Sequence, residues 1–171
     1  NTTVNSGGGL GISGGASATS TTINSGGFEA IFSGGTDIDA MIGGAEFVSS
    51  GGAVSNATVN SGGLLELFGG AITSGTNTVN AGGTLEIGSG FTISGFVVSS
   101  GVTLEIASGG ITSDTIVESG GTLNIFYGGT ADNTTNNGGA VIDNSSNAPT
   151  SHTVSSGETY VVAAGQIDDG D

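Results

Sequence analysis

Three glutamates recur at nearly equal spacing and form the main candidate site for metal chemistry. Glu66, Glu86 and Glu105 lie 20 and 19 residues apart, and each stands between two aliphatic residues. Stacked at a strand spacing of about 4.8 Å, neighbouring carboxylates repel by roughly 0.9 kcal/mol in a water-like dielectric. Calcium takes several oxygen ligands and would relieve that repulsion. The alternative interpretation is a row of solvated charges that keeps one sheet from aggregating with another.

The other reactive side chains argue against catalysis. The 171 residues include one histidine, His152, with no cysteine and no lysine or arginine. A catalytic triad needs a nucleophile and an acid beside its histidine, and zinc sites need several nitrogen or sulfur ligands. Hydrolysis of sugars needs two carboxylates facing each other in a cleft, which a ladder does not provide. We therefore predict no enzyme activity and no cofactor beyond the calcium considered above.

The charge of the chain also excludes two classes of partner. Fifteen acidic residues against no basic ones give a formal net charge of −15. Nucleic-acid binding depends on lysine and arginine contacts to phosphate, and polybasic membrane contacts depend on the same side chains. We therefore predict no nucleic-acid partner and no membrane contact by this segment.

Glycine pairs recur along the whole chain and set its organisation. The first glycine of each pair falls every 17 to 20 residues, at Gly7, Gly26, Gly43, Gly62, Gly82, Gly101, Gly120, Gly138 and Gly157. A second glycine corner follows seven or eight residues later in every repeat except the one near Asn144. A fixed period of this length indicates a repeat architecture, and glycine at this frequency excludes a helical bundle.

Apolar residues occupy fixed columns relative to these glycines. One column lies three residues before the first glycine, at Val4, Ile23, Val59, Val79, Val98, Val117 and Val154. Two more lie three and five residues after it, as Leu85 and Ile87 do after Gly82. Stacking these columns would bury a continuous interior, so we predict an all-β parallel β-helix of about nine coils of about 19 residues. We expect residues 1–171 to be a single segment and a fragment of a longer chain.

The second and third repeats fit this pattern poorly. Glu29 and Glu46 fall in the column that holds leucine elsewhere, with Phe28 and Phe47 beside them. An unpaired carboxylate is costly to bury. We therefore expect a local register shift that turns the two phenylalanines inward.

With these residues in view, the chain resembles the passenger repeats of AIDA-type autotransporter adhesins. Their pattern is Thr-x-Val-x-Ser-Gly-Gly, a short strand, then Gly-Gly and a small polar segment, which matches residues 2–15, 21–35, 58–70, 78–90 and 115–129. The resemblance implies a right-handed β-helix, secreted and attached to the outer membrane at the surface of a Gram-negative bacterium through a C-terminal barrel. It also implies adhesion, self-association and biofilm formation, and O-heptosylation of serine and threonine by a glycosyltransferase.

We accordingly predict a non-enzymatic adhesin segment whose partner is a host surface or another copy of itself. Two alternatives remain open at this point. One is an ice- or carbohydrate-binding solenoid, for which a threonine ladder would be the site, formed by Thr22, Thr58, Thr78, Thr115 and Thr153. The other is a passive spacer that holds a distal binding tip away from the cell.

Overall fold

The computed structural model describes residues 1–145 and, beyond them, the backbone of strands at 152–154 and 159–162. The chain comprises two compact units, Asn1–Leu85 and Glu86–Asp171, which are described separately below. Every regular element in the described residues is a β-strand. No helix in that part of the chain is long and apolar enough to cross a membrane.

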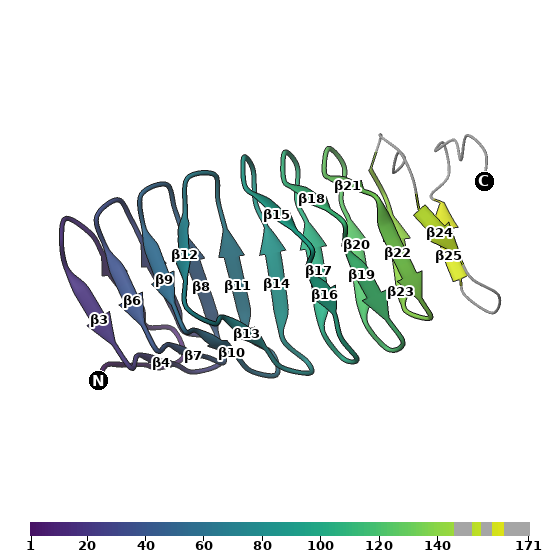
Figure 1. Cartoon of the computed structure of the whole chain (residues 1–171). Helices are drawn as coiled ribbons and strands as arrows, with labels where there is room; N and C mark the ends of the chain where they lie inside the picture. Colours follow the sequence, from purple (N-terminus) through teal and green to yellow (C-terminus); the bar gives the residue numbers. More distant parts are fainter. Residues whose placement is uncertain (146–151, 155–158, 163–171) are drawn as a thin grey trace. The chain divides into compact units, whose positions relative to one another are not determined.

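Unit 1 is a stack of turns that contribute strands to three parallel sheets (Figure 1). The four-residue strands form what we call its wide sheet: β2 (Gly9–Ile12), β5 (Phe28–Ile31), β8 (Ala45–Val48) and β11 (Leu64–Leu67). Two-residue strands form its first narrow sheet: β1 (Thr3–Val4), β4 (Thr22–Ile23), β7 (Met41–Ile42), β10 (Thr58–Val59) and β13 (Thr78–Val79). Three-residue strands form its second narrow sheet: β3 (Ser17–Thr19), β6 (Thr36–Ile38), β9 (Ala53–Ser55) and β12 (Ile72–Ser74).

Unit 2 repeats this plan after β14 (Thr84–Ile87), the strand that contains the boundary between the two units. Its wide sheet holds β17 (Thr103–Ile106), β20 (Thr122–Ile125), β23 (Ala140–Asp143) and β25 (Thr159–Val162). Its first narrow sheet holds β16 (Val97–Val98), β19 (Ile116–Glu118), β22 (Thr134–Asn137) and β24 (His152–Val154). Its second narrow sheet holds β15 (Thr92–Ser94), β18 (Ile111–Ser113) and β21 (Thr130–Asp132).

The predicted all-β parallel solenoid with turns of about 19 residues is confirmed. The described residues form about seven turns, compared with the nine coils counted from the glycine markers. The last of those markers, Gly157, lies outside the described residues.

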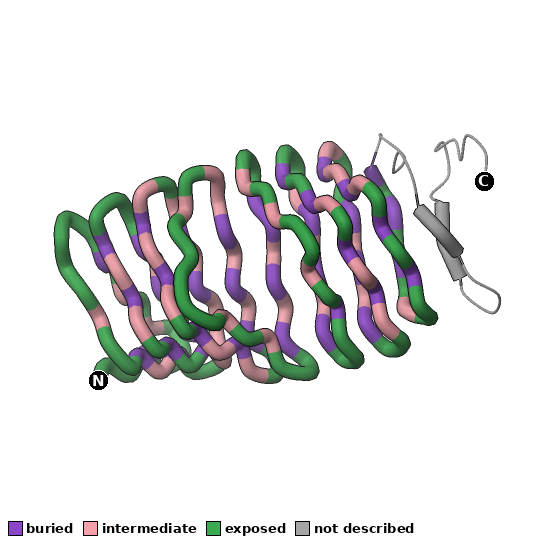
Figure 2. Tube along the Cα trace, in the orientation of Figure 1, coloured by how far each residue is buried: buried purple, intermediate pink, exposed green. Residues whose placement is uncertain are grey.

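The interior follows the predicted columns because alternate residues of each wide-sheet strand point inward. Ile31, Val48 and Ile106 are completely buried, and purple and pink segments alternate along the strands in Figure 2. Val79 is an exception, since it is only half-buried. The side chains of the last column members, such as Val154, fall outside the described residues.

Each turn closes through three corners, of which the sequence indicates two. The first two corners contain glycines of positive φ, such as Gly7 (φ 77°) and Gly109 (φ 77°). Left-handed backbone of this kind costs glycine little. The third corner also has positive φ but is occupied by varied residues, namely Ser20, Asp39, Asn56, Gly75, Gly95, Asp114 and Asn133. Asn and Asp tolerate this conformation better than most residues, which explains why no glycine repeat marks the corner.

The expected register shift in the second and third repeats is wrong. On β5 and β8 the pairs are Phe28 with Ala45 and Glu29 with Glu46, which keeps the same register as in the other turns. Both glutamates point inward and are completely buried, whereas Phe28 is 48% exposed. Glu29 and Glu46 therefore occupy the inward position that leucine has in other turns, and their carboxyl groups lie in the interior.

Candidate functional surface

Serine and asparagine form exposed but interrupted rows along the first corner, because Ile42 and Ala81 take the place of serine in two turns. Ser6, Ser25 and Ser61 are exposed, and Ser100 and Ser119 continue the pattern in unit 2. These rows are possible because the next corner residue is glycine. A Cβ on Gly26, for example, would lie only 2.6 Å from Ser6 Oγ. The corners thus present uncharged hydroxyl groups at the repeat distance of the strands.

Asparagine side chains join neighbouring turns beside these serines. Asn24 Nδ2 donates to Asn5 Oδ1 at 2.9 Å, and Asn80 Nδ2 donates to Asn60 Oδ1 at 3.2 Å. Most of the donors and acceptors in these pairs are exposed. The first corner therefore combines amide ladders with hydroxyl rows, and both can bond to a neutral polar partner.

The third corner carries a second polar row that the sequence does not reveal. Asp114 lies between two neighbouring turns, where it accepts a hydrogen bond from Ser94 Oγ at 3.3 Å and another from Asn133 Nδ2 at 2.5 Å. In unit 1, Asn56 Oδ1 accepts from the Thr76 backbone N–H at 3.0 Å. The signal in the sequence is a single Asn, Asp, Ser or Gly per turn, too variable to stand out among so many polar residues.

The three candidate metal ligands occupy the predicted outward positions of their strands. Glu66 on β11, Glu86 on β14 and Glu105 on β17 are each half-buried. Asn124 Nδ2 donates to Glu105 Oε1 at 3.1 Å. Burial, and then the charge of Glu105, raises the pKa of Glu86 above its ordinary value. In the part of the chain that the structure describes, no three His, Cys, Asp or Glu side chains are placed so that they could hold a metal ion. Calcium binding stays a prediction.

The threonine ladder of the ice-binding alternative is interrupted. Thr58 pairs with Thr78, but Met41 lies between Thr22 and Thr58 in the same row and is 53% exposed. Thr115 is completely buried, and its hydroxyl lies 2.5 Å from that of Thr112. A methionine in the row breaks the flat array of hydroxyls that ice recognition would use. The surroundings of the side chains of Thr153 and His152 lie outside the described residues.

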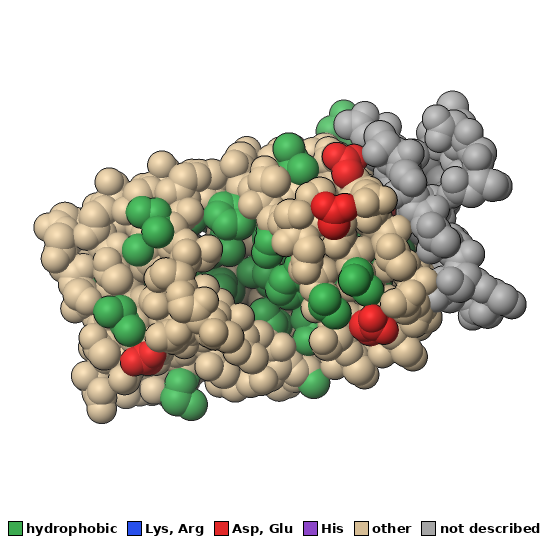
Figure 3. Space-filling model, viewed as in Figure 1, with side chains coloured by type: hydrophobic (Ala, Val, Ile, Leu, Met, Phe, Trp, Pro, Cys, Tyr) green, Lys and Arg blue, Asp and Glu red, His purple; other side chains and the backbone are tan. Residues whose placement is uncertain are grey.

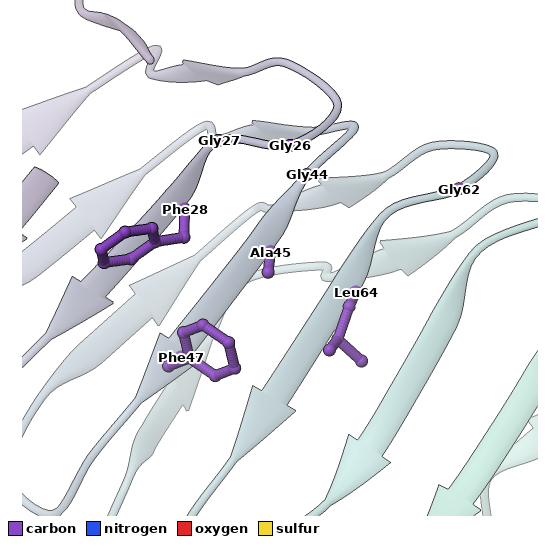
Figure 4. A pocket seen from close by; sticks show the side chains of 8 residues that line it. All are labelled: Gly26, Gly27, Phe28, Gly44, Ala45, Phe47, Gly62 and Leu64. Carbon is purple, nitrogen blue, oxygen red and sulfur yellow. The ribbon is translucent and has the colours of Figure 1, made fainter. Parts of the chain in front are cut away.

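A shallow apolar groove of about 420 Å³ opens on the outer face of the wide sheet in unit 1. Its walls are Phe28, Phe47 and Leu64, with Ala45 and the corner glycines between them (Figure 4). The outward residues of β2, β5 and β8 carry no charge, because the two glutamates of these strands point inward. The sequence does not reveal this groove, because the expected register shift places the two phenylalanines in the core.

The interior beneath this groove holds three carboxyl groups. Glu29, Asp37 and Glu46 are all 0% exposed. Asp37 Oδ1 accepts from the Ile38 N–H at 2.8 Å and from Thr21 Oγ1 at 3.4 Å. Among the described residues, no hydrogen bond of ordinary geometry reaches Asp37 Oδ2 or either oxygen of the two glutamates. Glu29 and Asp37 are nevertheless close enough to share a proton carried by Glu29.

Burial is the largest cause of the altered acidity of this cluster. It raises the pKa of Glu29 to about 9, with further contributions from the charges of Asp37 and Glu46. It raises the pKa of Glu46 to about 8, with a smaller contribution from Asp37. The pKa of Asp37 is also raised by burial, although its hydrogen bonds oppose the change. Both glutamates are therefore neutral at pH 7.

On the face drawn in Figure 3, the described surface is mostly uncharged polar side chains and backbone, with a few acidic residues and with hydrophobic side chains of which several gather near the middle of the view. Repetition and uncharged polar groups are thus properties that this face offers to a partner.

Comparison with solved structures gives one informative relative. The chain is 34% identical to a TibA fragment spanning residues 55–350, solved in a form hyper-glycosylated by TibC, with a TM-score of 0.61. The match covers 82% of this chain and 60% of the TibA fragment, so the chain spans less than two thirds of that relative. The resemblance to AIDA-type autotransporter passenger repeats is confirmed.

This similarity to an AIDA-type passenger agrees with the β-solenoid fold and with the hydroxyl-rich corners. Such a passenger implies a secreted or surface-exposed bacterial protein. No protein-family model matches the sequence, and no curated protein matches it.

Proposed function

We propose that this chain is a non-enzymatic segment of a bacterial surface adhesin that binds a host surface or a second copy of itself. The observation that carries the proposal is the similarity to the TibA passenger fragment over 82% of the chain. By this similarity, the segment belongs on the outer surface of a Gram-negative cell, where adhesion and self-association produce aggregates and biofilm.

Repetition supplies the mechanism of binding. The first corners offer the partner serine hydroxyls and asparagine amides, and three turns carry both residues, as Asn5 with Ser6, Asn24 with Ser25 and Asn60 with Ser61. Each contact is weak, but contacts on consecutive turns form together, so the effective concentration of the later ones is high and affinity rises without any single strong site.

The apolar groove of unit 1 is the surface on which a second copy docks. With 15 acidic residues and no basic ones, two copies repel wherever carboxylates face each other. The outward side of β2, β5 and β8 has no carboxylate, and it exposes Phe28 and Phe47. Aromatic side chains at uncharged positions dominate the energetics of many interfaces. Charge and apolar area therefore favour contact between copies at the same place.

Exposed corner serines are the proposed sites of O-glycosylation by a dedicated glycosyltransferase. TibC glycosylates the TibA fragment, and Ser6, Ser25 and Ser61 are exposed on tight corners here. In the transfer, the serine Oγ bonds to the anomeric carbon of a nucleotide-activated heptose. The nucleotide diphosphate leaves, and the hydroxyl proton passes to a base of the transferase. Mass spectrometry after co-expression with such a transferase should show heptose-sized increments on these serines.

Surface display tests the adhesive function. Bacteria that display residues 1–171 should settle from suspension and bind host cells more than bacteria that display an unrelated β-solenoid of equal length. In solution, sedimentation at low and high salt should show association that strengthens with salt, because salt screens the repulsion between copies. A segment that is monomeric under both conditions and confers neither settling nor binding is a passive spacer.

A further inference from the structure

The interior of unit 1 contains carboxyl groups but no positive charge to pair with them. Glu29 on β5 and Glu46 on β8 are partners in register, and Asp37 on β6 lies near enough to act on both. All three are completely enclosed. The chain has no lysine or arginine, so none of these carboxyl groups forms a salt bridge to a basic side chain.

The elements around the cluster bring no positive charge to the two glutamates, and the polar group that Glu29 approaches is the carboxyl group of Asp37. The neighbours of the two glutamates along the wide sheet are Leu10 and Leu65. Next to Asp37 along its own sheet, Val54 and Ala18 are apolar as well. The other titratable group that acts on the cluster is Asp39, an exposed residue whose negative charge disfavours ionisation of Asp37. The donors Ile38 N–H and Thr21 Oγ1 both serve Asp37.

We propose that this cluster is a proton-binding site, in which Glu29 and Glu46 are enclosed as neutral carboxylic acids that take up two protons when unit 1 folds at neutral pH. The unfolded chain carries both groups as carboxylates at pH 7, since the ordinary pKa of a glutamate lies near 4.3. On folding, each of the two carboxylates gains one proton from the solvent, on one of its two oxygens. Enclosing an ionised carboxylate without a partner costs far more than protonating it.

The sign of the pH dependence follows from these protons. The folded state binds more protons than the unfolded one between the ordinary pKa and the raised values of about 9 for Glu29 and about 8 for Glu46. The stability that the pair contributes is therefore complete below about pH 4 and is lost as the pH rises through 8 and 9. With two protons involved, the unfolding equilibrium constant should rise about 100-fold per pH unit between pH 5.5 and 7.5.

Urea unfolding of the full chain, followed by far-ultraviolet circular dichroism from pH 5.5 to 7.5, tests the proposal. In the wild type the unfolding equilibrium constant should rise about 100-fold per pH unit. In Glu29→Gln it should rise about tenfold per pH unit, and in Glu29→Gln/Glu46→Gln it should hardly change. The matched control, Asp114→Asn/Glu118→Gln, removes two carboxylates of unit 2 and should keep the wild-type pH dependence. Contributions from His152 and the other exposed carboxylates are common to all of these proteins and cancel in the comparison.

Two results would overturn the proposal: a wild type equally stable across this range, or a double variant that keeps the wild-type slope. If the Gln variant does not fold, Glu29→Leu/Glu46→Leu provides the same test with the side chains that Leu10 and Leu65 place in this row. Carbon-13 spectra of the glutamate carboxyl groups give an independent measure. At pH 7 two resonances should lie in the protonated range in the wild type, and their absence would refute the assignment.

Discussion

The ring of Phe28 lies over Gly9, its register partner on the preceding strand. A Cβ on Gly9 would stand 2.5 Å from Phe28 Cζ, so the aromatic ring fills the space that a side chain on Gly9 would take. Phe28 is thus supported on one side by backbone and opens on the other toward the groove. Because the ring of Phe28 packs against the backbone of Gly9, it can stay on the outer face of the sheet. This explains how β5 can point Phe28 outward and Glu29 inward.

The groove should be needed for association between copies. Replacing both aromatic walls, in Phe28→Ser/Phe47→Ser, removes two large apolar contacts, each worth about 2 kcal/mol at an interface of this kind. The dissociation constant measured by sedimentation should increase by at least about 30-fold for each residue replaced.

Phe126→Ser is the matched control for the groove variant, because Phe126 is 40% exposed but lies in unit 2. It should leave the dissociation constant unchanged. Melting temperatures of all variants show whether folding is intact. If the double variant associates as well as the wild type while displayed cells still aggregate, another face mediates the contact.

The second glycine of a corner should tolerate no side chain where the preceding turn lies close. A Cβ on Gly52 would be 2.6 Å from the carbonyl oxygen of Ile31, a backbone atom held in the ladder. Gly52→Ala should therefore destabilise the chain by about 2–3 kcal/mol in urea unfolding. Gly11→Ala is its control, because the added Cβ meets only Phe32 at 3.8 Å and should change stability by less than about 1 kcal/mol. Equal effects at the two positions would contradict the steric explanation.

The third corner should select for residues that accept a left-handed backbone. Asn133 has a φ of 54° and donates to Asp114. Asn133→Gly keeps the conformation and loses only the exposed hydrogen bond. Asn133→Val adds a branched side chain in a conformation that costs roughly 1–2 kcal/mol more. Thermal unfolding should place the valine variant clearly below the glycine variant, and the reverse order would be incompatible with the corner described here.

The outward glutamates should behave as solvated charges. Glu86 is half-buried, and its pKa is raised by burial and by Glu105, so its ionisation opposes folding. Glu86→Gln should therefore be neutral or slightly stabilising at pH 7, and its difference from wild type should vanish in acid, where Glu86 is protonated. Calcium titration by calorimetry should give no saturable heat. A saturable heat that disappears in Glu86→Gln would instead show that Glu86 takes part in calcium binding.

The sequence predicts the fold well because the fold depends on features that repeat. The glycine pairs and aliphatic columns recur in almost every turn, and the buried Ile31, Val48 and Ile106 occupy the expected places. The prediction is wrong in the second and third repeats, where the general cost of burying a charge was set against the column pattern. The leucine column predicts that Glu29 points inward, whereas the cost of burying a charge favours a register shift. That cost does not apply here, because Glu29 is buried as a neutral carboxylic acid. The groove was missed for the same reason, because it exists only when Phe28 and Phe47 face outward.

The corner glycines also decide how the protein responds to force. Hydrogen bonds such as those from Gly7 N–H to Gly26 C=O and from Gly101 N–H to Gly120 C=O, both 2.8 Å, connect each corner to the corner of the neighbouring turn. Tension applied to one end of the chain within a unit therefore loads the outermost turn first and reaches the next only after that turn has detached. Each detachment releases about 19 residues, or roughly 65 Å of extended chain. A cell held by such segments against flowing liquid would be restrained by a tether that lengthens in steps and can rewind when the drag falls.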